Sequence, residues 1–337
     1  MHPSAPWPAA ASAPAGGLSW RRRGVLLALC LVLATLPAIA HGIGQPFLIA
    51  TFTRFVIYAI AAVSLDLILG IGGLTSFGHA AWFGLGGYVV AIAAFHVQDG
   101  STLLGFAGST EALIAWPLAV VVTALVALPI GALSLRTSGI HFIMITLAFA
   151  QMLYYLFVSV KFYGGDDGLS MQRRNTLAGF DLRDATVFYY VCLACLAAWT
   201  ALCATIARSR FGMVLSACRQ SERRLSALGY PVYRYKLVAF VLAAAGAGLA
   251  GALWANAARF VSPDMLAWAK SGELMVMVIL GGAGTLFGPI AGAFVLLGVE
   301  QLLAAWTEHW MLILGPLLVL FVVFARSGLW GLVATRR

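Results

Sequence analysis

The sequence predicts an all-α fold, that of a polytopic helical membrane protein with about 8–10 transmembrane helices. Hydrophobic residues make up 62% of the 337 residues and charged residues only 10%, and the mean hydropathy is +0.94. Long apolar runs, such as residues 24–40, show no alternation with polar residues. Such runs favour helices over barrel strands, because helices satisfy their own backbone hydrogen bonds in lipid.

Ten stretches are long and apolar enough to be candidate spans. The eighth, 265–281, contains Lys270 and Glu273, so a half-helix that enters from one face is an alternative there. The number of spans therefore stays open at eight, nine or ten. The candidates are residues 24–40, 47–70, 80–96, 112–134, 140–160, 187–207, 237–257, 265–281, 290–306 and 310–325.

Basic residues fall on one side when ten spans are threaded alternately. Arg21–Arg23 precede the first span and Arg136 ends the fourth. Residues 208–236 hold seven of the 21 Lys and Arg residues and one acid, Glu222. Because cytoplasmic loops carry such an excess, both termini and this loop are predicted to be cytoplasmic. The net charge of +9 is then a topology signal, and nucleic acid is not an expected partner.

The expected organisation is a disordered cytoplasmic segment (1–23), a transmembrane domain (24–325) that contains the cytoplasmic loop 208–236, and a cytoplasmic tail (326–337). The basic residues before the first span, with Ala38–Ala40 at its end, also fit a cleaved signal peptide. An uncleaved span is the preferred interpretation, because the orientation above depends on that helix.

The cytoplasmic loop has a pattern of its own. Residues 219–228 predict a short amphipathic helix that ends at Gly229, a typical C-terminal cap, and Pro231 prevents its continuation. The polar stretch 232–236 is then expected to be a turn that leads into the next span. Such a rigid projection suits docking into a cleft on a partner protein, although a plain charged connector would also explain the basic excess.

Two glycine-rich stretches repeat one pattern in the two halves of the chain. Residues 72–81 read GGLTSFGHAA and residues 281–292 read GGAGTLFGPIAG. Interrupted helices in corresponding positions of a transporter indicate a substrate path, whereas close packing of small residues is the alternative. Asp66, just before the first stretch, is expected to bond to broken backbone. The candidate pathway residues are Thr75, Ser76, Gly78, His79, Thr146, Gln151, Gly281, Gly282, Gly284 and Thr285.

Enzyme chemistry is not expected. The sequence has no phosphate-binding G-x-x-x-x-G-K-[ST] motif, no H-E-x-x-H and no G-x-S-x-G. Cys192 and Cys195 have metal-like spacing, but they lie in an apolar helix without a second pair, so small buried residues are the better interpretation. No catalytic residue, metal site or cofactor is therefore assigned to this chain.

Four blocks resemble one family, the permeases of branched-chain amino-acid ABC importers. The longest, residues 211–255, is similar to the coupling loop of these permeases and the helix that follows it. The other blocks are residues 72–88, residues 136–169, which contain RTSG, TLAFAQ and GGDDGL, and residues 262–293. The second of these resembles the LivM-type subunit more than the LivH-type partner.

The resemblance implies an ABC importer permease fold and half of a transmembrane pathway. It also implies partners: two cytoplasmic ATPases that bind the ATP, a second LivH-like permease and a periplasmic or extracellular solute-binding protein. The expected location is the bacterial inner membrane, among membrane lipids. In such permeases a Glu followed seven residues later by a Gly seats in the ATPase, which Glu222 and Gly229 match. Small residues that usually follow the Glu are replaced by Arg223 and Arg224.

The coupling residues are thus expected to be Arg219, Glu222, Leu225, Leu228 and Gly229. Leucine, isoleucine or valine is the expected substrate, with urea, short amides or other small organic solutes as the alternative. An ion-coupled secondary transporter is the rival of a different class, since broken helices serve such carriers too. A carrier of that kind has no need of an ATPase-docking loop.

Overall fold

The computed structural model describes residues 20–103, 106–177, 180–324 and 328–334. Of the segment 1–23 that was predicted to be disordered, residues 1–19 lie outside this part, whereas residues 20–23 are helical and begin α1. Residues 326–327 and 335–337 of the predicted tail also lie outside it. The chain divides into two compact units, Met1–Pro46 and Phe47–Arg337. In the first unit, α1 (Trp20–Ile43) is a helix with Pro37 inside it. The predicted domain limits at residues 23 and 325 stay predictions.

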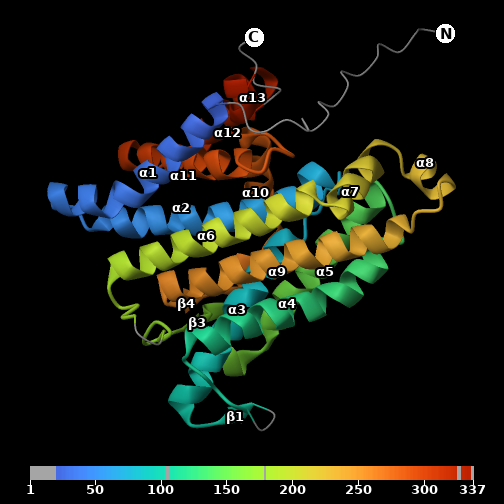
Figure 1. Cartoon of the computed structure of the whole chain (residues 1–337). Helices are drawn as coiled ribbons and strands as arrows, with labels where there is room; N and C mark the ends of the chain where they lie inside the picture. The colour runs from blue at the N-terminus through green and yellow to red at the C-terminus, as the bar shows by residue number, and fades with distance from the viewer. Residues whose placement is uncertain (1–19, 104–105, 178–179, 325–327, 335–337) are drawn as a thin grey trace. The chain divides into compact units, whose positions relative to one another are not determined.

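The second unit is a bundle of helices with two small antiparallel sheets of two strands each (Figure 1). Strand β1 pairs with β2, and β3 pairs with β4. The elements are α2 (Phe47–Asp66), η1 (Leu67–Ile71), α3 (His79–Asp99), β1 (Thr102–Leu103), β2 (Phe106–Ala107), α4 (Ala112–Ser134), α5 (Ile140–Ser159), η2 (Lys161–Tyr163), η3 (Gly165–Asp167), β3 (Leu169–Ser170), α6 (Ala185–Arg208), α7 (Arg210–Gln220), α8 (Glu222–Ala227), α9 (Val232–Ala258), β4 (Phe260–Val261), η4 (Pro263–Leu266), α10 (Trp268–Gly281), α11 (Gly288–Trp306), α12 (Trp310–Phe324) and α13 (Gly328–Ala334).

Seven helices in the described residues are long and apolar enough to cross a membrane, which confirms the predicted fold class. They are α2 with η1, α3, α4, α5, α6, α9 and α11. Shorter apolar stretches lie in α1 and α12. The predicted span 265–281 is divided into η4 and the 14-residue α10. A helix of that length rises about 21 Å, less than the hydrocarbon core, so α10 is too short for the full span predicted there.

Helix α9 lies at the centre of the second unit and packs against α2, α3 and α4 (Figure 1). Its middle carries small residues, and these bring backbones into contact. A Cβ atom at Gly86 of α3 would overlap the Gly248 carbonyl of α9, and one at Gly251 would overlap the Phe83 carbonyl. Close approach of this kind is typical of membrane helices that pack through small residues.

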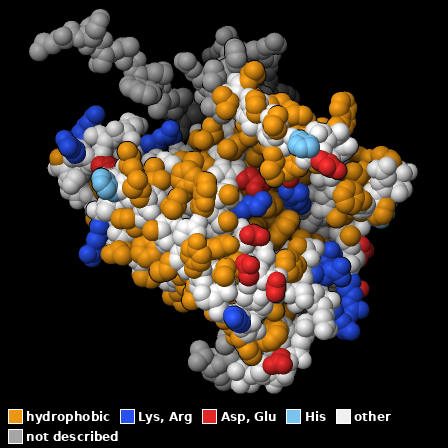
Figure 2. Space-filling model, turned by 180° about the vertical axis from the view of Figure 1, so that it is seen from behind, with side chains coloured by type: hydrophobic (Ala, Val, Ile, Leu, Met, Phe, Trp, Pro, Cys, Tyr) orange, Lys and Arg blue, Asp and Glu red, His pale blue; other side chains and the backbone are white. Residues whose placement is uncertain are grey.

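The outer surfaces of several helices are apolar. Figure 2 shows hydrophobic side chains over most of one face, with the charged side chains gathered in a few places. Exposed large hydrophobic residues repeat along α4, α5 and α12, as a surface that faces lipid requires. They include Leu113, Ile114, Leu118, Val121, Leu125, Met144, Met152, Leu156, Met311, Leu312 and Leu320.

The structure corrects two predictions about the basic loop 208–236. The single helix expected over 219–228 is broken at Ser221, whose extended backbone separates α7 from α8. The Ser221 hydroxyl accepts a hydrogen bond from the Arg224 amide, a local interaction that starts a new helix. The turn expected over 232–236 is instead the beginning of α9. Gly229 does lie between the helices with φ +84°, as a glycine cap requires.

Candidate functional site

Helices α7 and α8 form the charged loop between α6 and α9, at one end of the second unit (Figure 1). Exposed side chains on α8 and after it include Arg223, Arg224 and Leu228, and Leu228 is 72% exposed. Leu225 is half-buried. The loop therefore presents two arginines and a leucine to its surroundings, a combination that suits a protein interface.

Glu222 anchors α8 to the first turns of α9. Its carboxylate forms an ion pair with Lys236, whose side chain is only 9% exposed. A buried ammonium group needs such a partner, because an unpaired charge is costly away from water. Glu222 thus has a structural role in this chain, in addition to any contact that it makes outside it.

Arg219 is exposed as a residue, but its guanidinium reaches η1. Its guanidinium donates a hydrogen bond to the Gly70 carbonyl, and its stem lies against Gly73, where a Cβ atom would stand only 2.7 Å from Arg219 Cγ. Gly70 belongs to η1, a π-helical turn whose altered backbone exposes carbonyl groups. Of the predicted coupling residues, Arg219 thus joins the loop to the first glycine stretch.

The second glycine stretch meets this turn, which directly precedes the first stretch, in what we call the glycine junction: Asp66, Gly70, Gly284 and Leu286. Asp66 Oδ1 accepts a hydrogen bond of 2.6 Å from the Gly284 amide, and Oδ2 accepts one of 3.4 Å from Leu286. A Cβ atom at Gly70 would overlap both Asp66 and Gly284, so glycine is required there. The expectation that Asp66 bonds to broken backbone is confirmed.

The remaining glycines and Thr285 shape the turn between α10 and α11. The Thr285 hydroxyl donates to the Gly282 carbonyl at 2.6 Å and accepts from the Gly288 amide at 3.2 Å. A Cβ atom at Gly281 would overlap the Gly288 carbonyl. Helix α13, in the predicted tail, also packs here, with the Trp330 ring 5.8 Å from Phe287. Close packing through small residues, the alternative reading of these glycines, is therefore present at this turn.

A second group of predicted pathway residues fixes the start of α3. Ser76 and His79 are fully buried. His79 Nε2 is 3.0 Å from the Ser64 hydroxyl, and Gly78 lies against the Thr146 carbonyl of α5. Thr75 and Gln151 are half-buried. This group holds α3 against α2 and α5.

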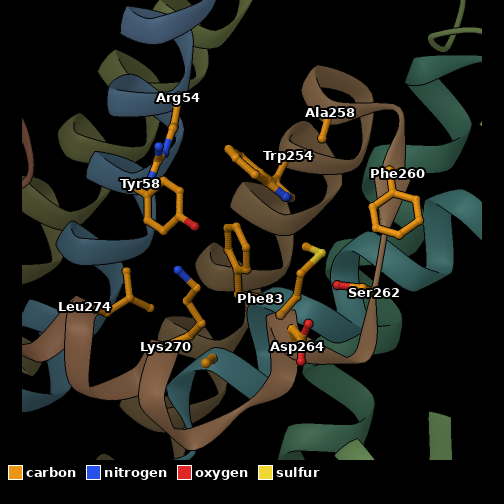
Figure 3. A pocket seen from close by; sticks show the side chains of 12 residues that line it. Arg54, Tyr58, Phe83, Trp254, Ala258, Phe260, Ser262, Asp264, Lys270 and Leu274 are labelled. Carbon is orange, nitrogen blue, oxygen red and sulfur yellow. The ribbon is translucent and has the colours of Figure 1, made fainter. Parts of the chain in front are cut away.

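A pocket of about 320 Å³ opens at the other end of α9. Lys236 and Trp254 are 18 residues apart on that helix, which places the pocket about 27 Å from the loop contact. The 12 side chains that line it come from α2, α3, α9, α10 and the segment between α9 and α10 (Figure 3). They are Arg54, Tyr58, Ala80, Phe83, Trp254, Ala258, Phe260, Ser262, Asp264, Met265, Lys270 and Leu274.

Charge and aromatic surface are combined in this pocket. Arg54 forms a 2.8 Å ion pair with Glu300 of α11, and Lys270 forms a 2.7 Å pair with Glu273. Both cations approach the Tyr58 ring, at 5.8 Å for Arg54 and 6.0 Å for Lys270, within the range of a cation–π interaction. None of the ten predicted pathway residues, all in the described part of the chain, lines the pocket.

Sequence reasoning missed the pocket because its charges looked unrelated. Arg54 and Glu300 are 246 residues apart in the sequence, yet their side chains form an ion pair. A sign was available in Lys270 and Glu273, two charges inside an apolar segment. Ionisable residues at membrane depth usually face a cavity or a partner, and both of these do.

Comparison with known proteins decides the family. The model of the family described as "Branched-chain amino acid transport system / permease component" matches residues 47–323. The chain belongs to this family. It is therefore a transport permease subunit, and this family is not one of enzymes. With its membrane-spanning helices, it is a multi-pass inner membrane protein.

Individual relatives agree with that assignment. The chain is 29% identical over 308 residues to the high-affinity branched-chain amino acid transport system permease protein LivM of Salmonella typhimurium and to that of Escherichia coli, with 83% of this chain and 69% of each relative covered. It is 27% identical over 293 residues to LivH of Salmonella typhimurium, with 81% and 91% covered. The predicted LivM-type resemblance is confirmed. No solved structure gives a significant match.

Proposed function

We propose that this chain carries a branched-chain amino acid across the inner membrane as one of a pair of permeases in an ATP-driven importer. Relatives of both types bear names of branched-chain amino acid permeases, which supports this substrate over urea or short amides. The second permease would be LivH-like, and a solute-binding protein would deliver the substrate from outside. ATP would bind to partner ATPases, with no cofactor in this chain.

The coupling of ATP hydrolysis to transport is the part that the geometry supports best. The observation that carries it is the hydrogen bond from Arg219 of α7 to Gly70 of the glycine junction. A partner that pushes on α8 would act on α7, then through Arg219 on the turn that Asp66 ties to Gly284. Packed elements with two discrete arrangements transmit such displacements.

The roles of single coupling residues follow from their positions. Arg223, Arg224 and Leu228 would contact the ATPase, since they are exposed. Leu225 and Gly229 would shape the projection, and Glu222 would fix it to Lys236. On this proposal α8 and both termini face the cytoplasm, as the excess of basic residues predicts, and the pocket at the far end of α9 faces outward.

Capture from detergent-solubilised membranes tests the proposal, with the full-length chain as bait. The variant Arg223→Glu/Arg224→Glu/Leu228→Asp should lose an ATPase subunit and keep a second permease, because it changes only exposed side chains of the loop. Arg173→Glu, an exposed arginine in the segment between α5 and α6, is the matched control and should keep both partners. If wild-type bait captures no ATPase, an ion-coupled carrier becomes the better interpretation.

A further inference from the structure

The pocket at the outer end of α9 is not used by the coupling loop or by the glycine junction. We propose that it is a binding site, within the permease itself, for the carboxylate and the aliphatic side chain of a neutral amino acid. The inference rests on the proposed function, since it places the transported substrate at named residues of this chain. Three parts of the pocket have separate roles: a cationic end would bind the ligand's carboxylate, an apolar wall would contact its side chain, and an acidic rim would exclude a second carboxylate.

The end of the pocket that would bind the ligand's carboxylate is formed by Arg54 and Lys270. Arg54 Nη2 and Lys270 Nζ each donate to a carboxylate behind them, which fixes both cations in position. A guanidinium has five N–H donors and an ammonium has three, so donors remain for a ligand.

Figure 3 shows how these groups are directed. The Lys270 ammonium and the Tyr58 hydroxyl turn toward the same space, and Arg54 lies on the same side of the pocket. A carboxylate placed there would meet two cations and a hydroxyl donor. Hydrogen bonds between charged groups are about twice as strong as neutral ones, so this end would orient the ligand.

The wall beside it is apolar. The Tyr58 ring packs against Phe83 at 5.6 Å and against Trp254 at 5.4 Å between centroids, and Leu274 is 2% exposed beneath them. A volume of about 320 Å³ is at the lower end of the range of small-molecule sites. The pocket therefore fits a single amino acid with an aliphatic side chain and is too small for a folded peptide.

The opposite rim is acidic. Asp264, with Ser262, lies across Phe83 from the cations (Figure 3), and Asp264 is exposed. A carboxylate in that place repels a second carboxylate on the ligand, because like charges close together raise the free energy of binding. The pocket should consequently accept leucine and exclude glutamate.

Direct binding to the full-length chain in lipid nanodiscs tests the assignment, with L-leucine as the probe. Lys270→Met should weaken leucine binding at least about tenfold, because it removes a charge-assisted donor. Glu273→Gln should weaken leucine binding less than Lys270→Met does, because the glutamine keeps an acceptor oxygen for Lys270 and leaves the ammonium charge in place. Lys161→Met, at an exposed lysine outside the pocket, is the matched control and should have no effect. Thermal unfolding of each variant checks that it is folded.

Two further ligands define the ends of the site. Leucinamide, which lacks the carboxylate, should bind at least about tenfold more weakly than leucine, and Lys270→Met should not weaken it further. Glutamate should bind poorly to the wild type, and Asp264→Asn should improve its binding at least about fivefold while leucine changes little.

Several outcomes would overturn the inference. They are the absence of saturable leucine binding, equal loss of binding in Lys270→Met and Glu273→Gln, and leucinamide bound as tightly as leucine. Uptake by the complete reconstituted importer separates this failure from that of the proposed function. If the wild type takes up no branched-chain amino acid, the proposed function fails. If it does, and Lys270→Met keeps its kcat and KM, only the pocket assignment fails.

Discussion

The two ends of α9 meet their surroundings in different ways. At the end near Lys236, two polar contacts link the elements: the ion pair of Lys236 with Glu222 joins α9 to α8, and the hydrogen bond from Arg219 to Gly70 joins α7 to η1. At the other end, Trp254 stands in a partly open pocket among aromatic rings. Between them the helix touches α3 backbone to backbone. The end near Lys236 is thus suited to transmit a displacement of the loop, and the end near Trp254 is suited to bind a small molecule.

The contact between α3 and the middle of α9 should be the part most sensitive to change. In Gly86→Val the new side chain would collide with the Gly248 carbonyl, a backbone atom that cannot step aside. Overpacking of this kind costs about 1–3 kcal/mol or more, and here we expect loss of folded protein, measured as yield and thermal unfolding. Gly298→Val in α11, where a Cβ atom meets nothing within 4 Å, is the matched control. A stable Gly86→Val variant would contradict the backbone contact.

The glycine junction should come next. Asp66→Ala leaves the Gly284 and Leu286 amides without their acceptor, and each unsatisfied buried donor costs about 1–3 kcal/mol. Thermal unfolding should shift to lower temperature, and uptake should fall. Asp66→Asn keeps one acceptor oxygen and should lose less of both. Equal behaviour of the two variants would show that these hydrogen bonds do not hold the junction.

The smallest effect on stability should come from the loop. Gly229 has φ +84° and a Cβ atom there would meet nothing within 4 Å, so Gly229→Val introduces only backbone strain of about 1–2 kcal/mol. We expect the variant to stay in the membrane while ATP hydrolysis becomes uncoupled from uptake. Gly229→Asn, a residue that tolerates the left-handed region, should stay coupled. Normal uptake by Gly229→Val would show that the loop geometry is not used.

The sequence predicts the helices well because lipid imposes a simple rule on them. Each long apolar segment from 47–70 to 290–306, except the divided segment 265–281, is helical in the structure, since no other conformation satisfies the backbone of a single segment in lipid. The role of Asp66 was also predictable, because a buried carboxylate next to interrupted helices needs N–H donors. The positive φ of Gly229 was predictable because the glycine ends a short helix and Pro231 prevents that helix from continuing.

Local breaks and distant pairs could not be predicted in this way. The break at Ser221 depends on a hydroxyl that starts a new helix inside a sequence with good helix formers. The pairing of Arg54 with Glu300 depends on how α2 and α11 pack. The contact between Arg219 and Gly70 required knowledge of where η1 lies. Each of these is set by tertiary packing, which hydrophobic periodicity does not report.

The backbone contact between α3 and α9 has a mechanical consequence. Long side chains between two helices can change rotamer and absorb a small shift, whereas Gly86, Gly248 and Gly251 offer no rotamers to change. A tilt of α9 that starts at Lys236 must then carry α3 with it, and Phe83 on α3 and Trp254 on α9 both line the pocket. A displacement at the Lys236 end of α9 would therefore change the shape of the pocket at the opposite end, because the α3–α9 contact has no flexible side chains to absorb it.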